Sequence, residues 1–164
     1  AGPAPGTRAY LRITLKLVAD GELAEAESRL SSSITEWDEN CPLELAVLYK
    51  YRGDVRTNLG QLESAVKDFS LSIENLKRSE EGDVPENVAV DGTLCVEETG
   101  DPEKQFCIYV PAQSDLYLRR ARVSMLLRDF AGAEESFSSV ISIAEEEGTR
   151  NPWALLYRGD ARMA

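Results

Sequence analysis

The sequence contains no histidine and only three cysteines, and both shortages exclude chemistry. Without imidazole there can be no Ser-His-Asp triad, no Cys-His dyad and no histidine metal ligand. Cys41, Cys95 and Cys107 are scattered, and no Cys-x-x-Cys pair occurs, so a four-thiolate zinc site is excluded. The sequence also has no glycine-rich phosphate loop. We therefore expect no catalytic residues, no cofactor and no metal ion, and we predict that the chain is not an enzyme.

Long apolar runs and excess positive charge are also missing. No stretch approaches the eighteen apolar residues that a membrane-spanning helix needs, so we expect no direct membrane span. The 18 basic residues are outnumbered by 29 acidic ones, and the isoelectric point is about 4.5, which argues against nucleic-acid binding. The first residue is Ala1 rather than Met, which we interpret as a trimmed start or as part of a longer product.

What the sequence does contain is a repeated helical pattern. Apolar and small residues recur at spacings of three and four in residues 62–76, and the same stripe returns about 39 residues earlier and about 68 residues later, at residues 23–37 and 130–144. A glycine precedes the first two stripes, where it would end the helix before. The tetrapeptide Tyr-Arg-Gly-Asp at residues 51–54 recurs unchanged at residues 157–160. We therefore predict a series of two-helix hairpins.

This pattern resembles the tetratricopeptide repeat (TPR) family, whose period is about 34 residues. Small residues occupy the places where that family packs two helices closely, and large residues fill the gap between neighbouring hairpins. The small residues are Gly53, Ala121 and Gly159 in first helices and Ala26, Ala65 and Ala133 in second helices, and the large ones are Leu30, Phe69 and Phe137. The first repeat departs from the family, since Thr14 stands where Gly or Ala is usual.

The resemblance implies an all-α protein, an α-solenoid of three TPR helix-turn-helix repeats plus part of a fourth, with a small acidic β-hairpin-like insert. The expected units are a disordered tail at residues 1–6, repeats at 7–40, 46–79 and 114–147, the insert at 80–113, and a first helix of a fourth repeat or a capping helix at 152–164.

The insert differs sharply from the repeats in charge and composition. Nine acidic residues against Lys104 give it a net charge of about −8, out of −11 for the whole chain. Residues 93–96 and 106–110 favour β-strands and flank a turn at residues 100–102. In such a hairpin Cys95 lies opposite Cys107, at a spacing that suits a disulfide. The alternative is two reduced thiols under a loop, and Cys41 is left as a structural thiol.

Binding to another protein is the function that remains. By the resemblance, the first helices line a concave wall that could hold an extended segment or a helix. The residues of this expected wall are Leu11, Leu15, Val18, Lys50, Asp54, Asn58, Leu118, Arg122 and Met125. Some family members clamp the C-terminal carboxylate of heat-shock chaperones with Lys, Asn and Arg. Here Leu11 and Leu15 replace the first Lys and Asn, and Asp115 opposes the later Lys, so we reject a chaperone adaptor.

Two charged regions are further candidates for partner contacts. In the insert, Glu97, Glu98 and Asp101 are expected to face a basic patch on a partner. A group of four arginines, Arg119, Arg120, Arg122 and Arg128, follows the insert. It is either a seat for an acidic peptide or for the insert, or a solvated helix face that Glu134 and Glu135 neutralise.

The first functional hypothesis is a scaffold or assembly module, a subunit of or assembly factor for a larger complex. The alternative is a regulatory or targeting module of a larger enzyme whose catalytic part lies outside these residues. The trimmed start and the expected disulfide favour an organelle, such as the chloroplast thylakoid lumen, or the secretory route, with the cytoplasm as the alternative. The sequence does not indicate the oligomeric state.

Overall fold

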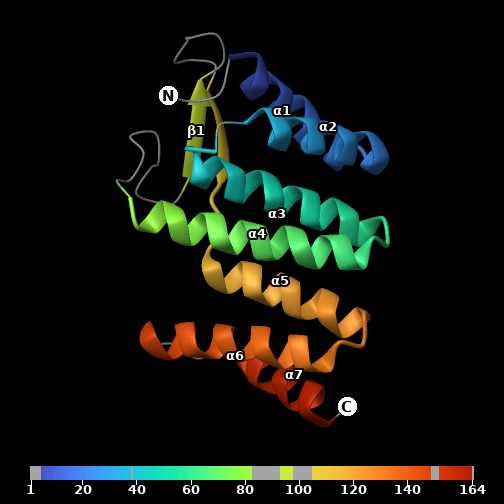
Figure 1. Ribbon diagram of the computed structural model, residues 1–164, viewed down its shortest axis with the longest axis vertical. Helices are drawn as coiled ribbons and strands as arrows, with labels where there is room; N and C mark the ends of the chain where they lie inside the picture. Colours follow the sequence, from blue (N-terminus) through green and yellow to red (C-terminus); the bar gives the residue numbers. More distant parts are fainter. Residues whose placement is uncertain (1–4, 38, 83–92, 98–104, 149–151, 164) are drawn as a thin grey trace.

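The computed structural model describes residues 5–37, 39–82, 93–97, 105–148 and 152–163, and shows helices stacked in sequence order (Figure 1). The helices are α1 (Pro5–Ala19), α2 (Leu23–Glu36), α3 (Pro42–Asn58), α4 (Leu62–Glu80), α5 (Gln113–Leu126), α6 (Phe130–Glu146) and α7 (Pro152–Met163). The strands β1 (Thr93–Glu97) and β2 (Gln105–Tyr109) form an antiparallel pair between α4 and α5. Each helix packs on the next one in sequence, and α4 packs on α5 although the insert separates them.

Tight turns join the two helices of each hairpin. Gly21 and Gly60 have φ of 80° and 79°, a left-handed conformation that glycine adopts without steric cost. At the equivalent place of the third hairpin the residue is Arg128, with φ of 59°. The Asp129 side chain accepts a 3.0 Å hydrogen bond from the backbone N–H of Gly132 and so caps α6. The third turn therefore keeps the geometry of the other two without their glycine.

The predicted ridge of small and large residues forms the core. Ala26, Ala65 and Ala133 are completely buried, and Phe69 and Phe137 are 1% exposed. Gly53 lies so close to the Phe69 ring that an added Cβ would be 2.7 Å from Cε1. Thr14, at the same place in the first repeat, is also fully buried. These observations confirm the all-α solenoid of repeated hairpins; the division of the sequence into units at the boundaries given above stays a prediction.

A buried ionic cluster links α2, α3 and α4. The carboxylate of Asp68 on α4 is 1% exposed and accepts from Arg52 at 2.7 to 3.1 Å and from Arg56 at 3.1 Å, both on α3. Arg52 also donates to the Ser31 hydroxyl on α2 at 3.3 Å. Arg56 reaches Glu27 on α2 at 3.2 Å. One carboxylate thus holds two arginines that in turn reach the preceding hairpin.

The same link occurs one repeat later, where the arginine has serine hydroxyls as partners and, among the described residues, no carboxylate. Arg120 on α5 donates to Ser136 on α6 at 2.9 Å and to Ser70 on α4 at 3.1 Å. These three residues occupy the places of Arg52, Asp68 and Ser31 when the repeats are superimposed in sequence. An arginine at this place therefore connects its own second helix with that of the preceding repeat.

The β-hairpin has the register that the sequence predicted. Cys95 pairs with Cys107 across the two strands. The turn between the strands and the hairpin's side chains lie outside the described residues, so the disulfide stays a prediction. The 1–6 tail is described only from Pro5 onward, where α1 begins.

The first prediction concerns Asp68. Replacing it with Ala leaves two arginines beside an empty buried site, so we expect the free energy of unfolding to fall by about 3 kcal/mol. Urea unfolding followed by circular dichroism measures this loss. Glu25→Ala is the control, since the exposed Glu25–Arg29 pair contributes about 0.5 kcal/mol or less. Equal effects of the two substitutions would show that the buried cluster does not stabilise the fold.

The second prediction compares two glycines at equivalent places. Gly53→Ala should destabilise the chain by about 1–3 kcal/mol, because the new methyl group collides with the buried Phe69 ring. Gly159→Ala should stabilise α7 by up to about 1 kcal/mol, because an added Cβ meets nothing within 4 Å and alanine favours helix. Thermal unfolding of both variants measures the shifts; shifts of the same sign would contradict the close packing.

The third prediction concerns the thiols. If a disulfide joins Cys95 and Cys107, protein that is denatured without exposure to a reductant should show one reactive thiol, that of Cys41. Adding reductant should raise the count to three. The measurement is titration with a thiol-specific chromophore, and three reactive thiols before reduction would rule the disulfide out.

Candidate protein-binding surface on the first helices

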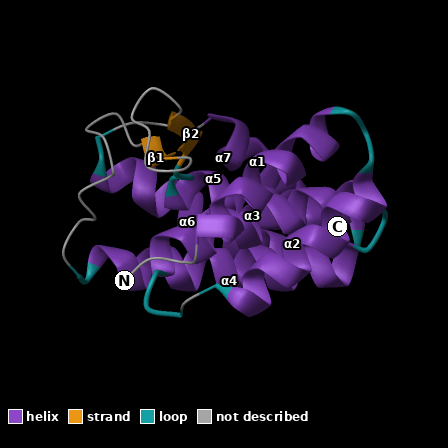
Figure 2. Ribbon diagram, turned by 90° about the horizontal axis from the view of Figure 1, so that it is seen from above, coloured by secondary structure: helices purple, strands orange, loops and turns teal. Residues whose placement is uncertain are grey.

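Three of the four first helices lie toward one side of the stack, and α3 lies between the two sides (Figure 2). Seen along the stack, α1, α5 and α7 lie toward the side that carries the β-hairpin, and α2 and α4 lie toward the opposite side (Figure 2). The residues predicted for the concave wall are carried by α1, α3 and α5. We use the name first-helix surface for three sets of residues together. They are these predicted wall residues, their ion-pair partners on α3 and α5, and the corresponding residues of α7.

The predicted wall residues differ in how far solvent reaches them. Lys50 and Asp54 are partly exposed, with side-chain exposures of 17% and 26%. Asn58 and Arg122 are exposed. The remaining described members are half-buried and pack against the core; they are Leu15, Val18, Leu118 and Met125. The side chain of Leu11 lies outside the described ones.

An ion-pair chain connects α3 and α5 on this surface. Lys50 lies 3.2 Å from Asp54, and Asp54 lies 2.5 Å from Arg119 on α5. Arg119 also pairs with Asp115 at 2.9 Å, one turn earlier on its own helix. Two cations and two anions alternate along the chain, so it is electrically balanced. The sequence placed Lys50 and Asp54 on the expected wall, and considered Arg119 only as one of the four arginines after the insert.

The surroundings of this ion-pair chain shift two pKa values. Burial raises the pKa of Tyr51, Asp54 raises it further, and Arg119 acts in the opposite direction. Burial alone would lower the pKa of Arg119, but the neighbouring Asp54 and Asp115 outweigh it and the pKa is raised. The Lys50 ammonium lies 4.3 Å from the centre of the Tyr51 ring. Tyr51 therefore stays a neutral phenol, able to donate a hydrogen bond, and Arg119 stays a cation.

The four arginines after the insert do not form one basic patch, which corrects the first interpretation of them. Arg119 is held by Asp54 and Asp115, and Arg120 lies between α4 and α6. Arg122 and Arg128 are exposed, and Arg128 forms the turn before α6. The spacing along one helix could not reveal that neighbouring arginines point to different helices.

The alternative, in which Glu134 and Glu135 neutralise those arginines, is also wrong for Glu134. Its carboxylate pairs with Arg162 on α7 at 2.8 Å. Glu135 is exposed on α6.

Sequence reasoning missed several members of this surface. Arg119 on α5 reaches Asp54 on α3, which lies 65 residues earlier, so spacing along the sequence does not reveal this pair. Asp115 and Tyr51 contact members of the ion-pair chain on their own helices, Arg119 and Lys50. On α7, three further residues stand at the places of Lys50, Asp54 and Thr57, and they are Leu156, Asp160 and Met163. Leu156 is 55% exposed and Met163 is 89% exposed. The recurrence of Tyr-Arg-Gly-Asp was the signal that could have located them.

The described residues contain neither a metal-binding group of side chains nor a membrane-spanning helix. In residues 5–37, 39–82, 93–97, 105–148 and 152–163, no three Cys, Asp or Glu side chains are grouped so that they could hold a metal ion. No described helix is long and apolar enough to cross a membrane.

Comparison by sequence gave no relatives, since no protein-family model and no curated protein matches the chain. Comparison by structure did. The first TPR domain of Spaghetti (RPAP3), bound to the HSP90 peptide SRMEEVD, has a TM-score of 0.60 and 15% identity, covering 96% of this chain and 90% of that one. The Sgt2 TPR domain from Aspergillus fumigatus has a TM-score of 0.56 and 16% identity, covering 98% and 80%.

A type III secretion (T3SS) complex from Aeromonas hydrophila also contains a similar chain. Its TM-score is 0.56 at 14% identity, covering 96% of this chain and 77% of that one. At these identities the likeness concerns the backbone arrangement. Combined with the repeated hairpins and their small-residue contacts, it shows that this chain has the fold of tetratricopeptide-repeat domains.

Proposed function

We propose that this chain is a protein-binding scaffold or assembly module, which holds a segment of another protein against the first-helix surface. The observation that supports this most directly is the ion-pair chain from Lys50 to Asp115. Its members are partly exposed, with 33% of the Arg119 side chain and 26% of the Asp54 side chain open to solvent. Charges placed this way add little stability, but they are positioned to exchange partners when a peptide binds.

Apolar groups on α5 and α7 complete the surface. Leu156 and Met163 on α7 expose large apolar side chains, and Leu118 and Met125 on α5 are half-buried. A surface with apolar anchors and a few fixed charges suits an extended or helical segment with both apolar and charged side chains. The module would form part of a larger complex.

The acidic insert is the second part of the proposal. Its charge of about −8 would attract a partner with a basic patch, through Glu97, Glu98 and Asp101. Attraction of this kind speeds association and depends on salt.

The HSP90 peptide bound by the first of the similar structures is not proposed as the ligand here. Leu11, Leu15 and Asp115 stand at places where the chaperone-binding members of the family have Lys, Asn and Lys. Asp115 also accepts from Arg119 at 2.9 Å, which occupies that cation. A C-terminal carboxylate would meet an acidic group at this place.

The experiment is partner capture with charge-reversed variants. Arg119→Glu breaks two ion pairs on the first-helix surface and should lower the recovery of the partner about tenfold or more, as loss of a central interface charge does. A triple reversal of Glu97, Glu98 and Asp101 to Lys should have a similar effect and should remove the salt dependence of binding. Quantitative mass spectrometry of the captured proteins measures both.

Arg29→Glu is the matched control, because Arg29 forms a comparable one-turn ion pair on α2, outside the first-helix surface. Circular dichroism should show that all variants keep the helical content of the parent chain. Partner recovery that is the same for Arg119→Glu, the triple variant and the control would refute the proposal.

A further inference from the structure

Two six-residue segments, on α3 and α7, differ at a single position. Residues 51–56 read Tyr-Arg-Gly-Asp-Val-Arg, and residues 157–162 read Tyr-Arg-Gly-Asp-Ala-Arg. On α3 this segment is the seat for α4. Arg52 and Arg56 share the carboxylate of Asp68, and Gly53 lies against the ring of Phe69. The segment on α3 therefore binds an acidic residue and the aromatic residue that directly follows it, Asp68 and Phe69 of α4.

The contact of α7 with the helix before it copies that of α3. Arg162 pairs with Glu134 on α6 at 2.8 Å, and Arg56, at the same place on α3, pairs with Glu27 on α2 at 3.2 Å. Glu134 and Glu27 also occupy the same place in their repeats. Ala161 is 3% exposed and Val55 is 1% exposed. The segment on α7 is thus oriented in the stack as the segment on α3 is.

At α7, the described residues include no counterpart of the contacts that α3 makes with α4. A Cβ built on Gly159 meets no atom of the described residues within 4 Å, whereas one on Gly53 meets the Phe69 ring. Arg158 forms no hydrogen bond or ion pair with a residue that the structure describes. The Arg162 side chain is 52% exposed, against 19% for Arg56. Arg158 and Arg162 of α7 are therefore accessible to a further carboxylate, and Gly159 leaves room for an aromatic ring.

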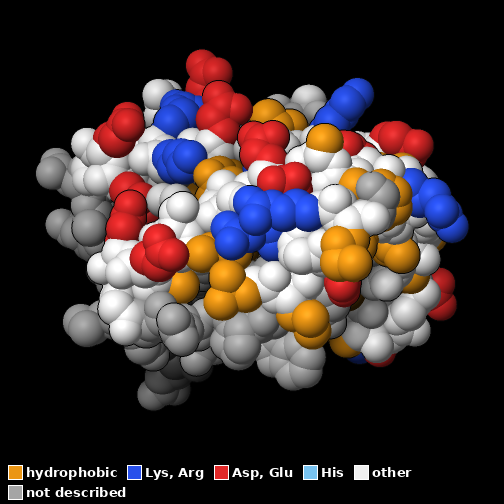
Figure 3. Space-filling view, turned by 90° about the horizontal axis from the view of Figure 1, so that it is seen from below, with side chains coloured by type: hydrophobic (Ala, Val, Ile, Leu, Met, Phe, Trp, Pro, Cys, Tyr) orange, Lys and Arg blue, Asp and Glu red, His pale blue; other side chains and the backbone are white. Residues whose placement is uncertain are grey.

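Two exposed leucines lie on the same helix as these groups. Leu155, at the place of Tyr49, is 41% exposed, and Leu156 beside it is 55% exposed. Viewed from the α7 end of the stack, basic and apolar side chains lie next to each other on the surface (Figure 3). A docking helix would cover the apolar groups and bring a carboxylate between the arginines.

We propose that the open side of α7, formed by Leu155, Arg158, Gly159 and Arg162, is a docking site for an amphipathic helix of a partner protein. That helix carries Asp or Glu directly followed by an aromatic residue. The carboxylate lies between the two arginines, as Asp68 does on α3, and the ring lies on Gly159. The four residues of this site are not members of the first-helix surface, although Leu156 adjoins both, so variants at Arg158 and Gly159 test this proposal separately from variants at Arg119.

A second copy of this chain is a poor source of such a helix. At the place of Asp68, α2 has Arg29 and α6 has Ser136, so α4 is the described second helix with the required acid. Asp68 is 1% exposed, so a folded copy cannot present it. The charge of the site and the burial of Asp68 together favour a different protein.

The probe is a synthetic peptide with the sequence of residues 61–81, labelled with a fluorophore and added to the intact chain. We expect saturable binding by fluorescence anisotropy. Peptides with Asp68→Lys or Phe69→Ala should bind at least about 30-fold more weakly, which is the effect of removing one member of a buried charge pair or a central anchor. Arg158→Glu in the chain should weaken the parent peptide by a similar factor.

Gly159→Leu is the decisive variant of the chain. Because no atom of the described residues lies within 4 Å of the added Cβ, it should fold normally by circular dichroism, yet its side chain occupies the place of the incoming ring and should abolish binding. Arg119→Glu, on the first-helix surface, should leave peptide binding unchanged.

Three results would overturn the proposal. The first is peptide binding that survives Gly159→Leu and Arg158→Glu. The second is a concentration-dependent dimer that Gly159→Leu abolishes, which would identify a second copy as the occupant. The third is absence of binding by the free peptide. In that case residues 59–81 are appended after Ala164 and the melting temperature is measured. A rise would show that the site binds a helix of the same polypeptide, and no rise would show that it binds no helix of this kind.

Discussion

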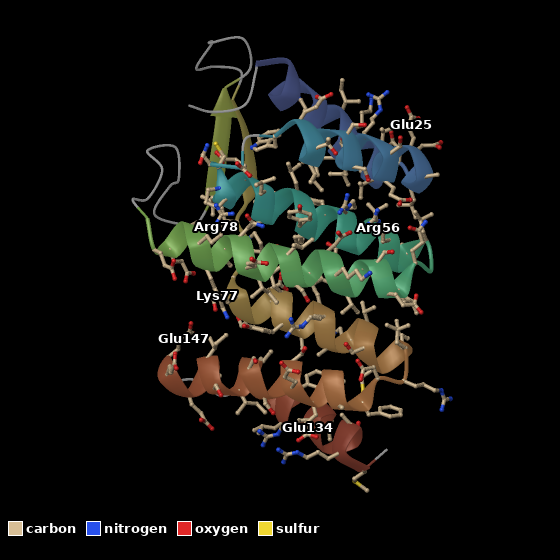
Figure 4. All side chains as sticks on the ribbon, viewed as in Figure 1. Glu25, Arg56, Lys77, Arg78, Glu134 and Glu147 are labelled. Carbon is tan, nitrogen blue, oxygen red and sulfur yellow. The ribbon has the colours of Figure 1, made fainter. Side chains whose placement is uncertain are left out.

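The buried carboxylate of Asp68 is the interaction on which the stack depends most. It lies between Arg52 and Arg56, which in turn contact Ser31 and Glu27 on the preceding hairpin. A lone charge at 1% exposure would be strongly destabilising, so the carboxylate is tolerated only where both arginines reach it. Apolar ridges alone allow neighbouring helices to slide, whereas this cluster is satisfied in one register. It therefore sets how α2, α3 and α4 are placed, and the position of α3 sets the first-helix surface. Figure 4 labels Arg56 in this layer and Glu134 at the corresponding junction of α6 and α7.

The sequence predicted the parts of the fold that repeat. An alanine at the place of Ala65 and a large apolar residue at the place of Phe69 recur in each hairpin, so their burial and close contact could be deduced from spacing. The pairing of Cys95 opposite Cys107 could also be deduced, because a hairpin's register follows from its turn. Asp68 could not, because its counterparts in the other repeats are Arg29 and Ser136. A residue that occurs in one repeat only gives no periodic signal.

The candidate site was predicted only in part for a related reason. Lys50 and Asp54 were expected on the wall from their place in α3, but the partner of Asp54 is Arg119, 65 residues later. Residues 80–113 separate the two in sequence, while α4 and α5 pack directly on each other. Closing a loop of this length costs about 3 kcal/mol of chain entropy. The packing of α4 on α5, with Arg120 reaching Ser70, offsets that cost, so the insert leaves the stack continuous.

The two ends of the stack differ in chemistry at one repeated place. The arginine position of the repeats is occupied by Ile13 on α1 and by Arg52, Arg120 and Arg158 on the later first helices. Ile13 is 48% exposed, so the α1 end presents an apolar group where the α7 end presents a cation. Each of Arg52 and Arg120 connects two second helices, and Arg158 has only α6 on one side among the described helices. The acidic helix proposed for α7 would thus complete the series of arginine links, whereas α1, without the arginine, could not hold a carboxylate in the same way. The proposed docking of an acidic helix would therefore be specific to one end, because an arginine stands at this place on α7 and an isoleucine on α1.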